Sequence, residues 1–128
     1  MWIFTRWGFY SVACARQGDG GHENEIDPHN LIVAATLRSQ LEAIQLHLPD
    51  LIGNCPIKEH SDADFKYQML VEKNIWSQVM LSLSQELNYD NFRDEMVKEH
   101  SMDDTEYLKQ LTSVANILLK PNKNEVSK

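Results

Sequence analysis

The pattern of apolar positions changes several times along the chain, from β-like stretches to helix-like ones. Residues 2–16 are rich in aromatic and β-branched side chains around Trp7-Gly8, which indicates two strands joined by a tight turn, or one strand bent at the glycine. Residues 65–72 alternate apolar and polar side chains, as a half-exposed strand does. Residues 31–37 are almost continuously apolar, so we expect a strand at the centre of a sheet, buried on both faces.

Apolar residues elsewhere recur at three- and four-residue steps, which is typical of amphipathic helices. Ser39 can cap a first helix that ends at Pro49. Asn74 can cap a second helix, the clearest in the sequence. Its apolar stripe consists of Trp76, Val79, Met80, Leu83 and Leu87.

The last third of the chain predicts two more helices. A short one is expected from about residue 91 to residue 100, and a longer one from Asp103 or Asp104 to Pro121. Residues 17–30, in contrast, contain three glycines, a proline and almost no apolar side chain, so we expect a surface loop there.

The resulting order is β-β-β-α-β-α-α, with no internal repeat. It predicts an α+β fold in which helices pack on one face of a small, mostly antiparallel sheet, a variant of the ferredoxin-like sandwich. A chain of 128 residues is long enough for one core only. We therefore expect a single domain over residues 1–120 and a polar C-terminal tail over residues 121–128.

Composition and charge narrow the function classes. The chain is 42% hydrophobic and 24% charged, as ordinary globular proteins are, and its net charge is −7. That charge argues against broad nucleic-acid binding, which depends on Lys and Arg neutralising phosphates, but it leaves room for a small local anion site. The apolar start of the chain is interrupted well short of the roughly 18 residues of a membrane span, and it lacks a signal-peptide pattern. These features predict a cytoplasmic protein without membrane contact.

The two cysteines, Cys14 and Cys55, have neither zinc-site nor redox-motif spacing. We expect both to be reduced and structural, with Cys14 inert in an apolar strand. A pairing of Cys14 with His29 or His60 as nucleophile and base is the less favoured alternative.

Several short segments share a pattern with known sequences. They are Met1–Thr5 followed by Gly8–Val12, the strand before Arg38, Phe65–Tyr67, and Asn88–Asp94 with its Tyr-x-Asn-Phe core. Together they span most of the chain and resemble a group of short uncharacterised bacterial proteins that open with an aromatic strand and a Gly-Phe-aromatic-Ser turn. Arg93 stands where that group more often has Lys. The resemblance implies fold and compartment, and it implies no activity.

Aromatic residues and arginines are concentrated in the first 16 residues. Exposed rings on a sheet can stack on bases or nucleotides while arginine binds phosphate. On this basis we predict a ligand site formed by Trp2, Arg6, Trp7, Tyr10 and Arg16. Core packing is the alternative, because strand alternation sends some of these rings beneath the helices.

A second candidate site is the polar stretch before the strand at residues 65–72. His60, Asp62 and Asp64 would project to one side of an extended chain and could bind a divalent ion. A Ser- and Asp-rich turn explains the same pattern. A hydrolase or nuclease would also bring Asp90 or Asp94 close to these residues.

The sequence therefore favours a non-enzymatic binding or regulatory module without a cofactor. The predicted partner is an unknown protein or a small anionic ligand, and a homodimer is compatible with the pattern. A small metal-dependent hydrolase or nuclease is the alternative. The segment Tyr89–Phe92 is predicted to be structural, with its rings turned to the core and Asp90 or Asn91 capping the next helix.

Overall fold

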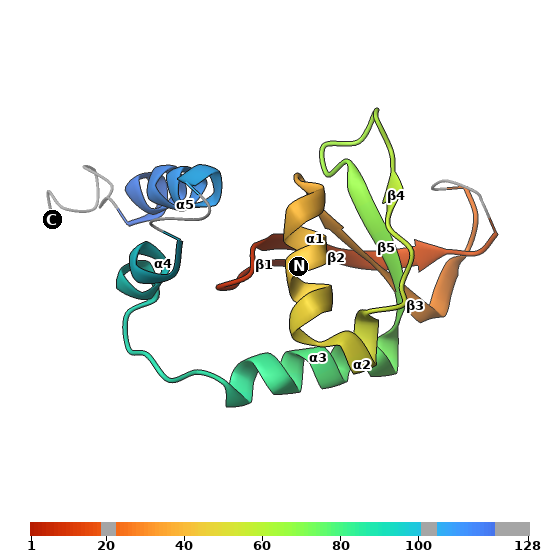
Figure 1. The fold of residues 1–128 in the computed structure, drawn as a ribbon. Helices are drawn as coiled ribbons and strands as arrows, with labels where there is room; N and C mark the ends of the chain where they lie inside the picture. The colour runs from red at the N-terminus through yellow and green to blue at the C-terminus, as the bar shows by residue number, and fades with distance from the viewer. Residues whose placement is uncertain (19–22, 101–104, 120–128) are drawn as a thin grey trace, which may run out of the picture. The chain divides into compact units, whose positions relative to one another are not determined.

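The computed structural model describes residues 1–18, 23–100 and 105–119 (Figure 1). The chain divides into two compact units, residues 1–87 and 88–128. The single domain expected over residues 1–120 stays a prediction, and the tail expected at 121–128 lies outside the described residues.

The first unit contains a five-stranded antiparallel sheet in the order β1-β2-β3-β5-β4, with three helices packed against it (Figure 1). The strands are β1 (Trp2–Phe4), β2 (Phe9–Arg16), β3 (Ile26–Ala35), β4 (Lys58–Glu59) and β5 (Tyr67–Glu72). The helices are α1 (Arg38–His47), α2 (Pro49–Ile52) and α3 (Lys73–Gln85). The predicted α+β class with an antiparallel sheet is confirmed.

The connections between strands are of two kinds. Successive pairing of β1 with β2 and of β2 with β3 makes a meander. Strand β5 then pairs antiparallel with both β3 and β4, so β3 and β4 run parallel with β5 between them. This is one split β-α-β unit, with α1 and α2 as the crossover. A ferredoxin-like fold contains two such units, so that finer topology is not established.

Strand β3 is central, as the apolar run at residues 31–37 predicted, but it begins earlier. The loop expected over residues 17–30 is shorter, because β3 already starts at Ile26. Pro28 falls where the pairing register with β2 shifts, between Asp27 and Leu31. A proline without a backbone N–H is tolerated at such an irregularity, which explains why a loop-like sequence forms a strand.

The core lies between the sheet and the helices. Alternate strand residues face the helices, and the register aligns Val12, Val33 and Met69 across three neighbouring strands. The buried residues of this core are Tyr10, Val12, Val33, Ala35, Met69 and Val71 from the sheet, and Leu41, Ile44, Ile52, Trp76 and Val79 from the helices. The predicted alternation is confirmed for residues 67–72, which form β5, whereas Phe65 lies in the turn before the strand and contacts Trp2 and Phe9.

The tight turn predicted at Trp7-Gly8 joins β1 to β2 and is held against α1. The Thr5 hydroxyl accepts hydrogen bonds from the backbone N–H groups of Trp7 and Gly8 at 3.0 and 3.1 Å. A Cβ atom at Gly8 would lie only 2.8 Å from Cβ of Gln40 in α1. Gln40 also accepts a hydrogen bond from the Phe9 N–H, and its backbone oxygen accepts one from the Tyr10 hydroxyl at 2.6 Å. The glycine is needed because α1 approaches the turn this closely.

Two predicted helix caps are wrong. Helix α1 is preceded by Leu37 and α3 by Glu72, and neither position forms a side-chain cap hydrogen bond. Ser39 and Asn74 are each the second residue of their helix. For α3 the reason is that β5 runs directly into the helix, which leaves no connecting residue for a cap.

The second unit contains α4 (Phe92–His100) and α5 (Thr105–Leu118), which pack on each other. Asn91 caps α4, because its side-chain oxygen accepts a hydrogen bond from the Asp94 N–H at 3.0 Å, and this cap was predicted. The rings of Tyr89 and Phe92 lie 6.2 Å apart, and both side chains are half-buried. The expected start of the last helix at residues 103–104 lies outside the described residues. None of the helices in the described ranges is long and apolar enough to span a membrane.

Candidate functional site

The face of the sheet opposite the helices carries an aromatic cluster, formed by Trp2, Phe4, Phe9 and Phe65. Strand alternation places Phe9 on this face, since its neighbour Tyr10 is buried in the helix-covered core. Phe4 stacks on Phe9 with ring centroids 4.4 Å apart, and Trp2 meets the same ring edge-on at 5.4 Å. Phe65, from the turn before β5, contacts both Trp2 and Phe9. Trp2 nevertheless remains 68% exposed.

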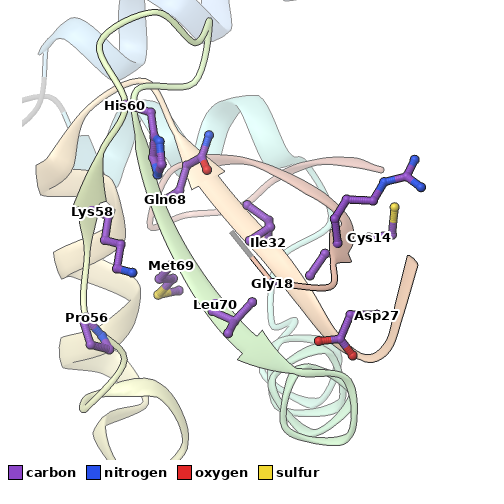
Figure 2. Close-up of a pocket in the computed structure, with 12 residues that line it drawn as sticks. Cys14, Gly18, Asp27, Ile32, Pro56, Lys58, His60, Gln68, Met69 and Leu70 are labelled. Atoms are coloured by element: carbon purple, nitrogen blue, oxygen red, sulfur yellow. The ribbon is translucent and has the colours of Figure 1, made fainter. Parts of the chain in front are cut away.

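A groove of about 690 Å³ lies on the sheet, from the end of β2 to β4 (Figure 2). Ile32 and Leu70 are register partners on β3 and β5 and form part of its apolar lining. Gln68 and His60 lie on the β5 and β4 side, and Cys14 lies on the β2 side (Figure 2). The volume falls in the range of small-molecule sites, which is roughly 300–1,000 Å³.

Charged side chains at the groove are mainly basic, although the whole chain is acidic. Arg16 and Lys58 line it together with His60, and Asp27 is the only acidic side chain among the lining residues. The Arg16 guanidinium donates one hydrogen bond to the backbone oxygen of Asn24 at 3.2 Å. Within the described part of the chain, neither Arg16 nor Lys58 is in an ion pair. Both cations are therefore available to a ligand.

Asp27 is held by its own strand. Its two carboxylate oxygens accept hydrogen bonds from the Asn30 side chain and from the His29 backbone N–H, each at 2.8 Å. These two contacts, the Asn30 side chain first, lower the pKa of Asp27 below its ordinary value. The register shift between β2 and β3 creates this arrangement, because residues 28–30 have no partner in β2.

The structure does not bring the five residues predicted as a ligand site together. Trp2 belongs to the aromatic cluster, and Arg16 lines the groove. Tyr10 is fully buried in the core. Trp7 packs on the helix side, where its ring stacks on His47 with centroids 4.1 Å apart, and Arg6 is half-buried in the turn before it. The structure thus brings only Trp2 and Arg16 to the uncovered face.

The residues predicted as metal ligands are not gathered into a metal-binding group. His60 lines the groove, whereas Asp62 and Asp64 are exposed in the turn that follows it. Among the residues that the structure describes, no three His, Cys, Asp or Glu side chains are placed to hold a metal ion. Asp90 and Asp94 belong to the second unit.

Cys14, which was expected to be a structural thiol within an apolar strand, is exposed. Its strand changes register between Cys14 and Ala15, and the buried position falls on Ala15 instead. Of the hydrogen bonds among the described residues, none joins Cys14 to His29 or His60. Cys55 is half-buried, and burial raises the pKa of its thiol.

Sequence reasoning missed Phe65, Ile32, Leu70 and Lys58 as site residues. Leu70 carried a usable signal, since it is apolar at a position where the alternation of residues 65–72 calls for a polar side chain. No protein-family model, curated protein or solved structure matches the chain. The site must therefore be interpreted from its own geometry.

Proposed function

We propose that this protein is a small non-enzymatic binding module and that the uncovered face of its sheet is the binding surface. The observation that carries the proposal is the groove of about 690 Å³, which is lined by Arg16 and Lys58 and by exposed apolar side chains such as Leu70. Neither cation forms an ion pair with another described residue. A half-enclosed apolar site with a few polar groups at its margin is the usual form of a small-molecule site.

The exposure of apolar residues on this face supports the proposal. Trp2 is 68% exposed and Leu70 is 51% exposed. Such side chains gain free energy when a ligand removes them from water, at about 25 cal/mol for each Å² of apolar surface. A contiguous apolar surface with a polar rim is typical of interaction sites.

No structural observation favours the alternative, a metal-dependent hydrolase or nuclease. Other predictions from the sequence keep some support. The two free cysteines fit a reducing compartment such as the cytoplasm. The split β-α-β unit formed by β3, β5 and β4 supports a relationship to ferredoxin-like folds.

A fragment screen by NMR tests the proposed surface without assuming a ligand. We expect binding fragments to shift the backbone amide signals of Ile32 and Leu70 more than those of the helices. Leu70→Glu should abolish these shifts by placing a charge in the groove. Leu81→Glu is the matched control, since Leu81 is 57% exposed and lies in α3. Fragments that bind wild type and Leu70→Glu equally well would refute the proposal.

A further inference from the structure

We infer that the groove binds an elongated small molecule with an apolar middle and an anionic group at each end. This inference rests on the proposed function, because it names the class of ligand that the uncovered face would take. Three features of the groove carry it: an apolar floor, a cation on each side, and a carboxylate that is already hydrogen-bonded.

The apolar floor accounts for the middle of the ligand. Ile32 and Leu70 are direct partners on the two central strands of the groove, and Leu70 is half-exposed. Figure 2 shows both side chains between Cys14 on one side and Lys58 on the other. A polar molecule placed here would lose water contacts without gaining partners, whereas a hydrocarbon chain would bury apolar surface on both sides.

The two cations account for the ends of the ligand. Arg16 is the last residue of β2, and Lys58 is the first residue of β4. Strands β3 and β5 lie between them, so the two residues are three strand spacings apart across the sheet, or roughly 14 Å. They are also offset along the sheet, because Arg16 pairs with Ile26 at the start of β3, whereas Lys58 pairs with Gln68, the partner of Ala34 near its end. Both side chains are long and flexible, and each can bind one carboxylate or phosphate. One compact anion could not satisfy both, but an elongated molecule with two anionic ends could.

Asp27 reduces the positive charge of the groove. It lines the same groove, so its negative charge opposes the binding of an anion. Its oxygens already accept hydrogen bonds from Asn30 and His29, so it is not free to form an ion pair with Arg16 without losing them. The charges at the groove are thus two cations against one carboxylate, in a chain whose net charge is −7. This local excess is what favours an anionic ligand.

Three probes of equal length isolate the charged ends: decanedioate, decanoate and decanediol. In NMR titrations of the full chain we expect decanedioate to bind about 1.5-fold to fivefold more tightly than decanoate, because one more partly exposed ion pair forms. Decanediol should bind most weakly. Arg16→Gln and Lys58→Gln should each reduce the affinity for decanedioate to about that for decanoate. Lys73→Gln, an exposed lysine in α3, is the control and should change nothing.

The exposed thiol of Cys14 supplies a second readout. A molecule lying in the groove should slow alkylation of Cys14 by iodoacetamide, and decanedioate should protect it more than decanediol does. Asp27→Asn should strengthen this protection, since it removes the one negative charge from the lining.

The outcomes separate the ligand class from the proposed function. Equal affinity for the three probes, or unchanged decanedioate binding in both Arg16→Gln and Lys58→Gln, would overturn the inference. If no probe binds while neutral fragments still bind in a Leu70-dependent manner, the ligand class is wrong and the binding surface stands. If Leu70→Glu leaves all binding unchanged, both proposals fail.

Discussion

The two faces of the sheet are built from the same strands and both carry apolar side chains, but only one is covered by the helices of its unit. Neighbouring residues of β5 show the contrast, since Met69 is 1% exposed and Leu70 is 51% exposed. Met69 belongs to the core with Val33 and Ile44 and only borders the groove, whereas Leu70 is outside that core and lines the groove with half of its side chain exposed. An apolar side chain is thus informative about function where it faces away from the core.

The largest expected effect comes from truncating the same strand on its two faces. Met69→Ala removes buried atoms from a packed core and should lower the free energy of unfolding by about 2–5 kcal/mol. Leu70→Ala should lower it by about 1 kcal/mol or less, because the side chain is half in water. Urea unfolding of both variants measures the difference. Equal losses would mean that the uncovered face is packed like the covered one, which would contradict the difference between the two faces.

A smaller effect is expected where the helix layer is held to the covered face. Gly8→Ala would place a Cβ atom 2.8 Å from Cβ of Gln40, so the β1–β2 turn and α1 must move apart. We expect a loss of about 1–3 kcal/mol, as in other overpacked sites. Ser11→Ala is a control in β2, the strand that follows this turn, since Ser11 pairs with Trp2 on the uncovered face. A Gly8→Ala variant as stable as Ser11→Ala would show that α1 is not fixed by this turn.

Much of the covered side was predictable from the sequence, because burial leaves a periodic pattern. The alternation in residues 67–72, the apolar run before Thr36 and the stripe around Trp76 and Val79 all reflect contact with one core. The start of β3 was not predictable, because a register shift accommodates Pro28 in a segment with the composition of a loop. The cap at Asn74 failed because β5 runs directly into α3, and the cap at Ser39 failed because α1 already begins at Arg38.

The site was less predictable, because its residues come from four strands that only the tertiary fold brings together. Periodicity shows that Phe9 and Tyr10 face opposite ways, but it does not say which face the helices cover. Lys58 belongs to a strand of two residues, too short to leave a pattern. The basic character of the groove was not predictable either, because Arg16 and Lys58 are far apart in a sequence that is acidic as a whole.

The smallest expected effect lies at the far end of the groove, where polar contacts replace burial. The pKa of Asp27 is lowered from its ordinary value of 3.8, first by the Asn30 side chain and then by the His29 N–H. The folded state therefore favours the ionised carboxyl group, and this stabilisation is complete above pH 3.8 and is lost as the pH falls through the lower folded-state pKa.

Asp27→Asn should accordingly be slightly less stable than wild type at neutral pH, and the two unfolding midpoints in urea should converge as the solution is acidified below that value. Asp62→Asn removes the same charge from an exposed turn and corrects for the change in net charge. Midpoints that stay equally far apart over the whole acid range would mean that the side chain of Asp27 acts through its shape alone. In that case the charge of Asp27 would add no stability through its two hydrogen bonds at 2.8 Å.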